Sequence, residues 1–286
     1  MSKLFLVLIP ILMTSLSSVA QEKAVDVPMS FYGPRPVIEV MVNGKGPFRF
    51  LIDTGAQGMA RADTSLVEQL GLSITGQKAA TDSSAKTQAA INEVRFTTLS
   101  IARLKFRDVP AFSRNYNTVT YLPHIDGILG PELFAHYLLT LDYPNGRVRI
   151  TEGELPKSDG RQILDYEIIE GNLYTEIAIG KLKVKAEIDT GNIRALDLPS
   201  SLVRNLAFAS YPRLVGKGSG VSGEFELKEV QLQDTLRIGV YSFPEPLVTF
   251  TDFYEEVNIG SSLLRKFVIT LDQKNHRLRL IKPNKR

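Results

Sequence analysis

The tripeptide Asp-Thr-Gly occurs twice in the chain, at residues 53–55 and at residues 189–191. Each copy follows an apolar run that is typical of a buried strand. An aspartate at a strand end is held by the sheet while its carboxylate stays reachable. Glycine two residues later permits a tight turn and the close approach of another backbone, and the threonine hydroxyl can bond to a facing loop. Both loops are therefore suited to carboxylate chemistry.

If the two loops meet, Asp53 and Asp189 share one site. Two carboxylates in contact cannot both ionise, so the pair holds one proton over a wide pH range. The ionised partner can take a proton from water while the protonated partner donates to the carbonyl oxygen of an amide. We therefore predict peptide-bond hydrolysis with Asp53 and Asp189 as the catalytic residues. The supporting loop residues are Thr54, Gly55, Ala56, Thr190, Gly191 and Asn192.

Composition excludes several other chemistries. The 286 residues contain no cysteine and only three histidines, and the formal net charge is +3. Without cysteine there are no disulfides, thiolate metal sites or thiol nucleophiles. So small a positive charge gives no electrostatic case for a nucleic-acid partner. The expectation is an enzyme with no metal and no cofactor.

The first twenty residues read as a secretory signal peptide. Lys3 precedes the ten-residue apolar run 4–13, and small residues lead to a cleavage site before Gln21. The run is too short to span a bilayer. The alternatives are an uncleaved anchor and a buried strand. The favoured interpretation predicts export to the periplasm or the extracellular space, with no stable membrane anchor after cleavage.

The chain also contains an internal repeat. At an offset of 136, residues 44–70 match residues 180–206 without a gap, and at an offset of 130 the segment 130–149 matches 260–279. Repeats of this kind indicate duplicated structural units. We predict an N-terminal lobe at 21–150, a polar linker at 151–160 and a C-terminal lobe at 161–286.

Each unit is predicted to consist mostly of strands. Alternating apolar residues and turn signals favour two hairpins, at 36–52 and 174–188, and two strands near the end of each unit. Short helices are expected at 65–70 and 200–207. Many short strands with few helices indicate an all-β protein.

These features resemble the aspartic proteases, in particular bacterial retropepsin-like proteins with two fused copies. The resemblance rests on the repeated Asp-Thr-Gly and on an apolar-apolar-Gly segment further along, which in the family lies behind the aspartate loop. It implies a pepsin/retropepsin-like acid-protease fold, in which two homologous β-barrel-like lobes form a pseudo-twofold, monomeric pseudo-dimer that acts on peptide or protein substrates. The segments behind the loops are Ile128, Leu129 and Gly130, and Asn258, Ile259 and Gly260.

The second unit departs from the family pattern at two positions. Asn192 stands where the family prefers Ser, Thr or Ala, and Asn258 occupies an apolar position. We expect the Asn192 amide to donate to Asp189, because Ala56 can give Asp53 no such bond. A hydrogen bond to the charged form favours ionisation, so Asp189 is predicted to be the base and Asp53 to carry the proton.

A mobile flap over the site is expected from the resemblance. In the second unit residues 215–224 are rich in Gly and Ser, and Gly218, Ser219 and Gly220 are candidate substrate-binding residues. The corresponding segment 76–90 is polar and predicted to be a loop. Residues 218–223 also spell GxGxxG, but a strand-like run follows instead of a helix, so nucleotide binding is disfavoured. Two other functions stay open: a catalytically inactive peptide-binding module, and a processing protease with a single target.

Overall fold

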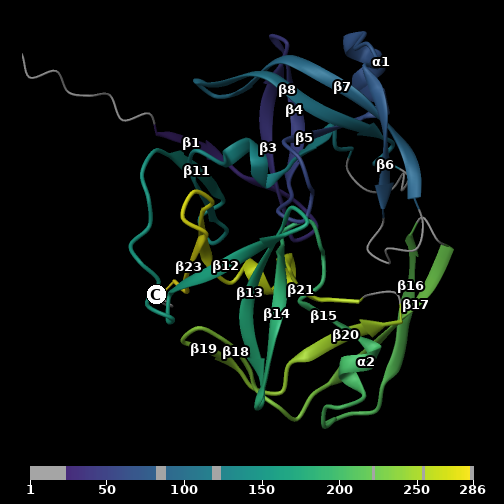
Figure 1. Ribbon diagram of the computed structural model, residues 1–286, viewed down its shortest axis with the longest axis vertical. Coiled ribbons are helices and arrows are strands. Elements are labelled where there is room, and N and C mark those ends of the chain that lie inside the picture. Colours follow the sequence, from purple (N-terminus) through teal and green to yellow (C-terminus); the bar gives the residue numbers. More distant parts are fainter. Residues whose placement is uncertain (1–23, 82–87, 118–123, 221–222, 253–254, 284–286) are drawn as a thin grey trace, which may run out of the picture.

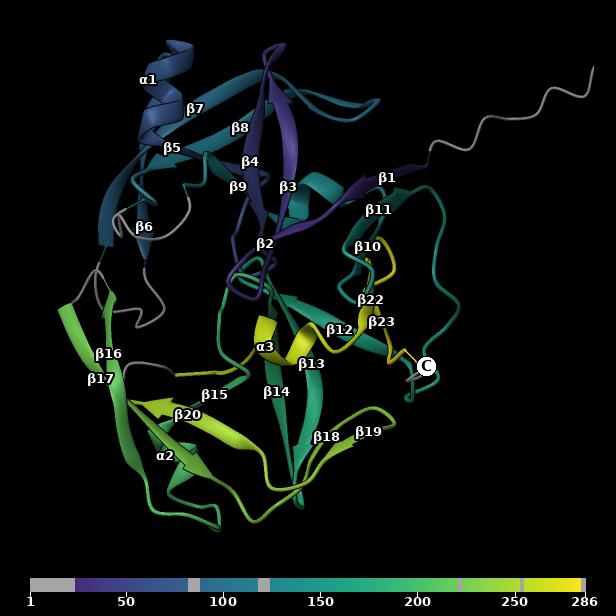
Figure 2. The same ribbon diagram turned by 180° about the vertical axis from the view of Figure 1, so that it is seen from behind.

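The computed structural model describes residues 24–81, 88–117, 124–220, 223–252 and 255–283. These residues form two β-sheets with a few short helices, as predicted for an all-β protein. Figure 1 shows the N-terminal half above the C-terminal half, and Figure 2 shows the same arrangement from behind. The predicted signal peptide, residues 1–20, lies outside the described part of the chain.

The smaller sheet contains eight strands, all from the N-terminal half. Their order is β2-β3-β4-β9-β5-β8-β7-β6. The strands are β2 (Ser30–Tyr32), β3 (Arg35–Val42), β4 (Lys45–Ile52), β5 (Ala60–Asp63), β6 (Gly76–Thr81), β7 (Gln88–Ile101), β8 (Leu104–Arg114) and β9 (Gly127–Leu129). Strands β3 and β4 form the predicted hairpin, and its turn places Asn43 at φ 51°, a conformation that asparagine tolerates.

The larger sheet draws strands from both halves. The strands are β1 (Val25–Pro28), β10 (Leu138–Asp142), β11 (Arg147–Thr151), β12 (Ile163–Ile169), β13 (Asn172–Ile179), β14 (Leu182–Asp189), β15 (Leu196–Pro199), β16 (Arg213–Gly220), β17 (Gly223–Gln231), β18 (Leu236–Ile238), β19 (Tyr241–Phe243), β20 (Leu247–Thr251), β21 (Val257–Gly260), β22 (Val268–Asp272) and β23 (Arg277–Ile281). Its main path is β1-β11-β10-β22-β23-β12-β13-β14-β21-β15-β20-β17-β16.

The two halves are joined where β10 pairs antiparallel with β22. In this register Thr140 lies opposite Thr270, and their hydroxyl oxygens are 3.0 Å apart. The segment 151–160 also contacts the C-terminal half, because the buried Leu155 donates its backbone N–H to Asp272 Oδ2 at 2.8 Å. The paired strands fix how the halves sit against each other.

In the described part of the chain, four short helical segments lie between the strands: α1 (Thr64–Leu70), the 3₁₀ helix η1 (Pro131–Phe134), α2 (Ser200–Val203) and α3 (Ser261–Leu264). Helix α1 agrees with the prediction; Asp63 caps its first turn and Gly71 ends it at φ 63°. The prediction of a helix over 200–207 was too long. After α2 the chain joins the sheet, where the Ala209 N–H donates to the Gln231 carbonyl at 2.8 Å and Phe208 bridges Leu232.

Alternation along the strands places their apolar side chains in the core. In β13 every second side chain from Leu173 to Ile179 is buried, whereas Glu176 on the opposite face is exposed. Strand β9 is different, since all of Gly127–Leu129 is buried between β4 and β5. The segment behind the first aspartate loop is thus enclosed on both sides.

Two hairpins lie on the same side of the molecule, and their free ends point toward one another (Figures 1 and 2). One is β16–β17, in the predicted flap of the C-terminal half. The other is β6–β7, so the prediction of a loop over 76–90 was wrong for the described residues, because Gly76 to Thr81 pairs with Glu93 to Gln88. A polar composition does not prevent pairing when a long partner strand supplies the hydrogen bonds. Residues 82–87 and 221–222 of the predicted flaps lie outside the described part.

Within the described residues, no helix is long and apolar enough to cross a membrane.

Candidate active site

The two Asp-Thr-Gly loops follow the inner strands of two corresponding hairpins. Asp53 comes directly after β4 and Asp189 is the last residue of β14. A short strand runs parallel to each: β9 beside β4, and β21 beside β14. The Asp53 N–H donates to the Leu129 carbonyl at 3.0 Å. Each aspartate is therefore anchored by the apolar-apolar-Gly segment predicted to lie behind it.

The two loops are bonded to each other through their threonines. The Thr54 N–H donates to Thr190 Oγ1 at 3.0 Å, and the Thr190 N–H donates to Thr54 Oγ1 at 3.0 Å. Each hydroxyl then donates onward, Thr54 to the Ile188 carbonyl at 2.5 Å and Thr190 to the Ile52 carbonyl at 2.7 Å. Both threonines are 1% exposed. The four buried bonds fix the loops at one relative position.

This position places the carboxyl groups of Asp53 and Asp189 side by side where the two loops meet. Each carboxyl also lies against the glycine of the opposite loop. A Cβ added to Gly191 would lie 2.3 Å from Asp53 Cγ, and one added to Gly55 would lie 2.7 Å from Asp189 Cγ. Glycine is required at both positions because any side chain would occupy the place of a carboxyl group.

Glycine is equally necessary at the ends of the segments behind the loops. A Cβ on Gly130 would lie 2.0 Å from the Gly58 carbonyl oxygen, and one on Gly260 would lie 2.3 Å from the Arg194 carbonyl oxygen. The Gly130 N–H donates to the Met59 carbonyl at 3.0 Å. The backbone of each segment is packed directly against the turn that carries an aspartate.

The surroundings of Asp53 favour its protonated form. Burial, followed by the negative charge of Asp189, raises the pKa of Asp53 to about 7, although the nearby Arg61 guanidinium opposes the shift. The Gly55 N–H donates to Asp53 Oδ1 at 2.9 Å. Behind the loop, Leu51 and Ile128 pack in an apolar cluster with Ala56. Arg61 was not among the predicted site residues, because its place beside the pair depends on the β5–β9 pairing, in which it lies opposite Ile128.

Asp189 has more hydrogen-bond donors. Its Oδ1 accepts the N–H groups of Gly191 at 2.8 Å and of Asn192 at 3.1 Å, and its Oδ2 accepts the Asn258 side-chain amide at 2.9 Å. Such donors stabilise a carboxylate in its ionised form. The expectation that the Asn192 side chain supplies this bond was wrong. Asn258, which was predicted to lie in the segment behind the loop and noted as a departure from the family pattern, supplies it.

The Asn192 side chain points away from the pair because it has other partners. Its Oδ1 accepts the Arg194 N–H at 3.0 Å, and its Nδ2 donates to Asp197 Oδ2 at 2.7 Å and to Asn258 Oδ1 at 2.8 Å. Asp197 is 1% exposed and also accepts from Arg194 Nε at 2.7 Å. Burial raises the pKa of Asp197, while the bonds from Arg194 lower it. Asn192 therefore orients Asn258 and acts on Asp189 only through its backbone.

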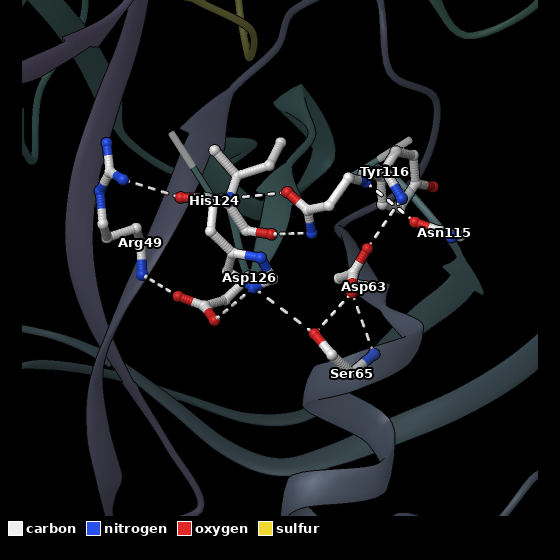
Figure 3. Close-up of polar contacts among 9 residues, drawn as sticks. Arg49, Asp63, Ser65, Asn115, Tyr116, His124 and Asp126 are labelled. Atoms are coloured by element: carbon white, nitrogen blue, oxygen red, sulfur yellow. Dashed lines mark hydrogen bonds and ion pairs between the residues drawn. The ribbon is translucent and has the colours of Figure 1, made fainter. Parts of the chain in front are cut away.

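A polar cluster at the edge of the N-terminal half holds the elements around the Asp53 loop (Figure 3). Asp63 accepts the Tyr116 N–H at 2.7 Å and the Ser65 hydroxyl at 2.6 Å, and Asp126 accepts the Arg49 N–H at 2.7 Å. His124 Nε2 lies 3.5 Å from Ser65 Oγ and 3.3 Å from Asp126 Oδ1. One ring nitrogen faces both groups, so this trio lacks the two-nitrogen relay of a serine hydrolase. Its contacts tie α1, β4 and the start of β9 together.

The structure thus brings together both aspartates, their loop residues and the segments 128–130 and 258–260. The flap candidates Gly218, Ser219 and Gly220 lie in β16 of the β16–β17 hairpin, where they pair with Phe225, Glu224 and Gly223. Among the residues that the structure describes, no group of three or more His, Asp or Glu side chains is arranged to hold a metal ion.

The arrangement agrees with a comparison against known protein families. Residues 38–133 match the aspartyl protease family model. This stretch begins in β3, includes the Asp53 loop and ends in η1 after the segment behind that loop. A search of curated proteins finds no match. The matched segment and the two-sheet architecture show an all-β, aspartyl protease-like fold, and they support membership of an aspartyl protease family.

Proposed function

We propose that the protein is an aspartic endopeptidase whose catalytic residues are Asp53 and Asp189. The observation that carries this proposal is the position of each carboxyl group against the glycine of the opposite loop, held by the reciprocal Thr54–Thr190 bonds. Two carboxyl groups that share a proton can activate a water and protonate a carbonyl oxygen at the same time.

The two aspartates have different roles in this mechanism. Asp189, which has three donors, is the ionised base that takes a proton from the attacking water. Asp53, with its pKa near 7, keeps a proton up to neutral pH and donates it to the carbonyl oxygen of the scissile bond. The water adds to the carbonyl carbon, and Asp189 then passes the proton it took from the water to the amine nitrogen. The C–N bond breaks as Asp53 takes a proton back from the former carbonyl oxygen, which returns both aspartates to their starting states. No covalent intermediate with the protein forms.

The substrate in this proposal is an extended peptide or protein segment bound between the two halves. Strand edges and hairpins can pair with a peptide backbone, and we assign this role to the β6–β7 and β16–β17 hairpins. The two halves are proposed to be copies of one unit, so that a monomer supplies both aspartates without a cofactor. Support for the duplication comes from the symmetry of the Thr54–Thr190 and Thr140–Thr270 contacts.

The test is cleavage of a mixed peptide library by the wild type and by the variants Asp53→Asn and Asp189→Asn. Cleavage that both substitutions abolish supports the proposal. Asp108→Asn is the matched control, because Asp108 is exposed on β8 at φ 51°, a conformation that asparagine also adopts. Peptide binding without cleavage, unaffected by either substitution, would overturn the proposal in favour of an inactive binding module.

Export is proposed from the signal-like segment 1–20. Production of the full chain in a bacterial host, followed by fractionation and N-terminal analysis, tests it. A periplasmic or secreted product that begins at Gln21 is the expected result; a cytoplasmic product that still carries Met1 contradicts it.

A further inference from the structure

A third acid lies directly behind the aspartate pair. Glu187 precedes Asp189 by two residues on β14 and is half-buried. Its Oε2 accepts a hydrogen bond from Asn258 Nδ2 at 2.9 Å, and the same nitrogen donates to Asp189 Oδ2 at 2.9 Å. One amide group therefore connects the two carboxyl groups.

The orientation of this amide is fixed by its other end. Asn258 Oδ1 accepts from Asn192 Nδ2 at 2.8 Å, so the NH₂ group of Asn258 must face the two acids. The β14–β21 register also places Asn258 directly beside Glu187. The contact is therefore determined by the backbone pairing as well as by side-chain bonds.

The groups that face Glu187 make its ionisation unfavourable. Burial, and then the charge of Asp189, raise the pKa of Glu187 to about 8; Asp53 and Glu256 add to the shift, and the bond from Asn258 opposes it. On β13, Tyr174 lies opposite Glu187 and donates its hydroxyl to Glu256. Glu187 is thus an acid whose neutral form is favoured, and the Asn258 amide connects it to Asp189.

The N-terminal half has no such acid at the equivalent place. There the β4–β9 register pairs Leu51 with Ile128, and both are buried in an apolar cluster. The polar pair Glu187–Asn258 is therefore not a requirement of the loop geometry, which the first half achieves without it.

We propose that Glu187 is a positioning residue for the aspartate pair: while neutral it anchors the Asn258 amide on Asp189, and its ionisation places a second negative charge behind Asp189 that ends activity at alkaline pH. This inference rests on the proposed function. A charged Glu187 disfavours the ionised form of Asp189 by like-charge repulsion, so the single negative charge of the pair shifts to Asp53 and the base that activates the water is lost.

The first experiment measures coupling without catalysis. The free energy of unfolding is followed from pH 4 to pH 9 for the wild type and Glu187→Gln. Because the folded pKa of Glu187 is raised, its stabilising contribution is complete below pH 4.5 and is lost as the pH rises to about 8. Glu187→Gln is therefore expected to gain stability relative to the wild type over that range. The same comparison in an Asp189→Asn background is expected to show a smaller gain.

Glu176→Gln is the control for this experiment, because Glu176 is an exposed acid on the neighbouring strand β13 that pairs with Lys183. The inference would be overturned if the free energy of unfolding had the same pH dependence in the wild type and in Glu187→Gln. It would also be overturned if the gain in stability from Glu187→Gln were as large in the Asp189→Asn background. NMR titration of the Glu187 carboxyl carbon tests the inference in the wild type, without a variant. A Glu187 pKa at the usual value of a glutamate would also overturn the inference.

The second experiment is the pH profile of kcat/KM on a cleaved peptide. The wild type is expected to lose activity at alkaline pH with a slope approaching two protons, from Asp53 and Glu187, whereas Glu187→Gln is expected to lose it with a slope of one. Glu187→Leu, which leaves the Asn258 amide without this acceptor, is expected to lower kcat at every pH, and Gln to restore most of it. If the enzyme cleaves peptide but Glu187→Gln leaves the slope of the alkaline limb unchanged, the inference about Glu187 is contradicted and the proposed function is not. A wild type that cleaves no peptide would contradict the proposed function, and the unfolding data would still test the coupling.

Discussion

The surroundings of Asp53 and of Asp189 differ much more than the loops that carry them. Both loops have the same threonine bonds, the same glycine contacts and a glycine-ended segment behind them. Behind Asp53, however, the packing is apolar, through Leu51 and Ile128, whereas Asp189 is backed by the polar side chains of Glu187 and Asn258.

Two loops with the same backbone geometry can therefore hold aspartates whose surroundings favour different protonation states. Two identical side chains in contact must divide one proton between them, and the surrounding groups decide which one holds it. In this protein the donors gather on Asp189, while burial and the neighbouring charge raise the pKa of Asp53. In the proposed mechanism Asp53, which has apolar surroundings, is the acid, and Asp189, which has polar surroundings, is the base.

The largest effects are expected from Asp53→Asn and Asp189→Asn. Each should lower kcat/KM by about 10²–10⁴-fold, as expected for loss of a general acid or base, but their effects on stability should be opposite. The raised pKa of Asp53 means that its stabilising contribution is present below pH 4 and is lost as pH rises through about 7. Asp53→Asn should therefore gain stability relative to the wild type over that range.

Asp189→Asn should be destabilising instead, because an amide cannot accept all three donors, and one unsatisfied donor costs about 1–3 kcal/mol. Thermal and denaturant unfolding between pH 4 and pH 8 measure both variants. Similar stability changes for the two would show that the halves are not chemically distinct.

Thr54→Val and Thr190→Val test the symmetric part of the comparison. Each removes one buried hydroxyl that donates to a carbonyl and accepts an N–H, so we expect a loss of about 2–5 kcal/mol of stability for either. Equal losses in denaturant unfolding are expected because the two sets of bonds are reciprocal. Thr→Ser at either position is the control, since it keeps the hydroxyl. A large loss for only one threonine would contradict the symmetry.

Asn258→Leu places an apolar side chain behind Asp189, where the N-terminal half has Ile128 behind Asp53. It removes a hydrogen bond to a carboxylate, worth about 1.5–3 kcal/mol, and we expect kcat/KM to fall about 10–100-fold at acidic pH. The physical reason is that Asp189 loses a donor that stabilises its ionised form, so the acidic limb of the pH profile should move upward. Ile128→Leu is the matched control. An unmoved acidic limb would show that Asn258 does not tune the pair.

The smallest effects are expected at the strand pair that joins the halves. Thr140→Val removes the bond to Thr270, and we expect a loss of about 0.5–1.5 kcal/mol of stability. Thr270→Val should cost more, because Thr270 is 1% exposed and also accepts from Arg279 Nη2 at 3.1 Å. Thermal unfolding of both variants measures the difference, and the reverse order would contradict it.

The alternation of apolar and polar residues, together with the turn residues, was sufficient to predict the strand-rich class, the two hairpins and helix α1. These signals depend on residues that are close together in the sequence. The tripeptide spacing predicted the aspartate loops for the same reason. Helix α2 was predicted too long, and β6 was predicted as a loop. In both segments hydrogen bonds to strands distant in sequence decided the outcome, and local propensity does not include such bonds.

The sequence by itself determined the residues that can do the chemistry: two Asp-Thr-Gly loops, two glycine-ended segments, and no cysteine. Only the tertiary structure decided which amide reaches Asp189. The sequence pointed to Asn192, its neighbour along the chain, but the bond comes from Asn258, which is distant in sequence and close in space. Side-chain direction depends on strand register and on competing partners, and both are set by contacts between elements far apart in the chain.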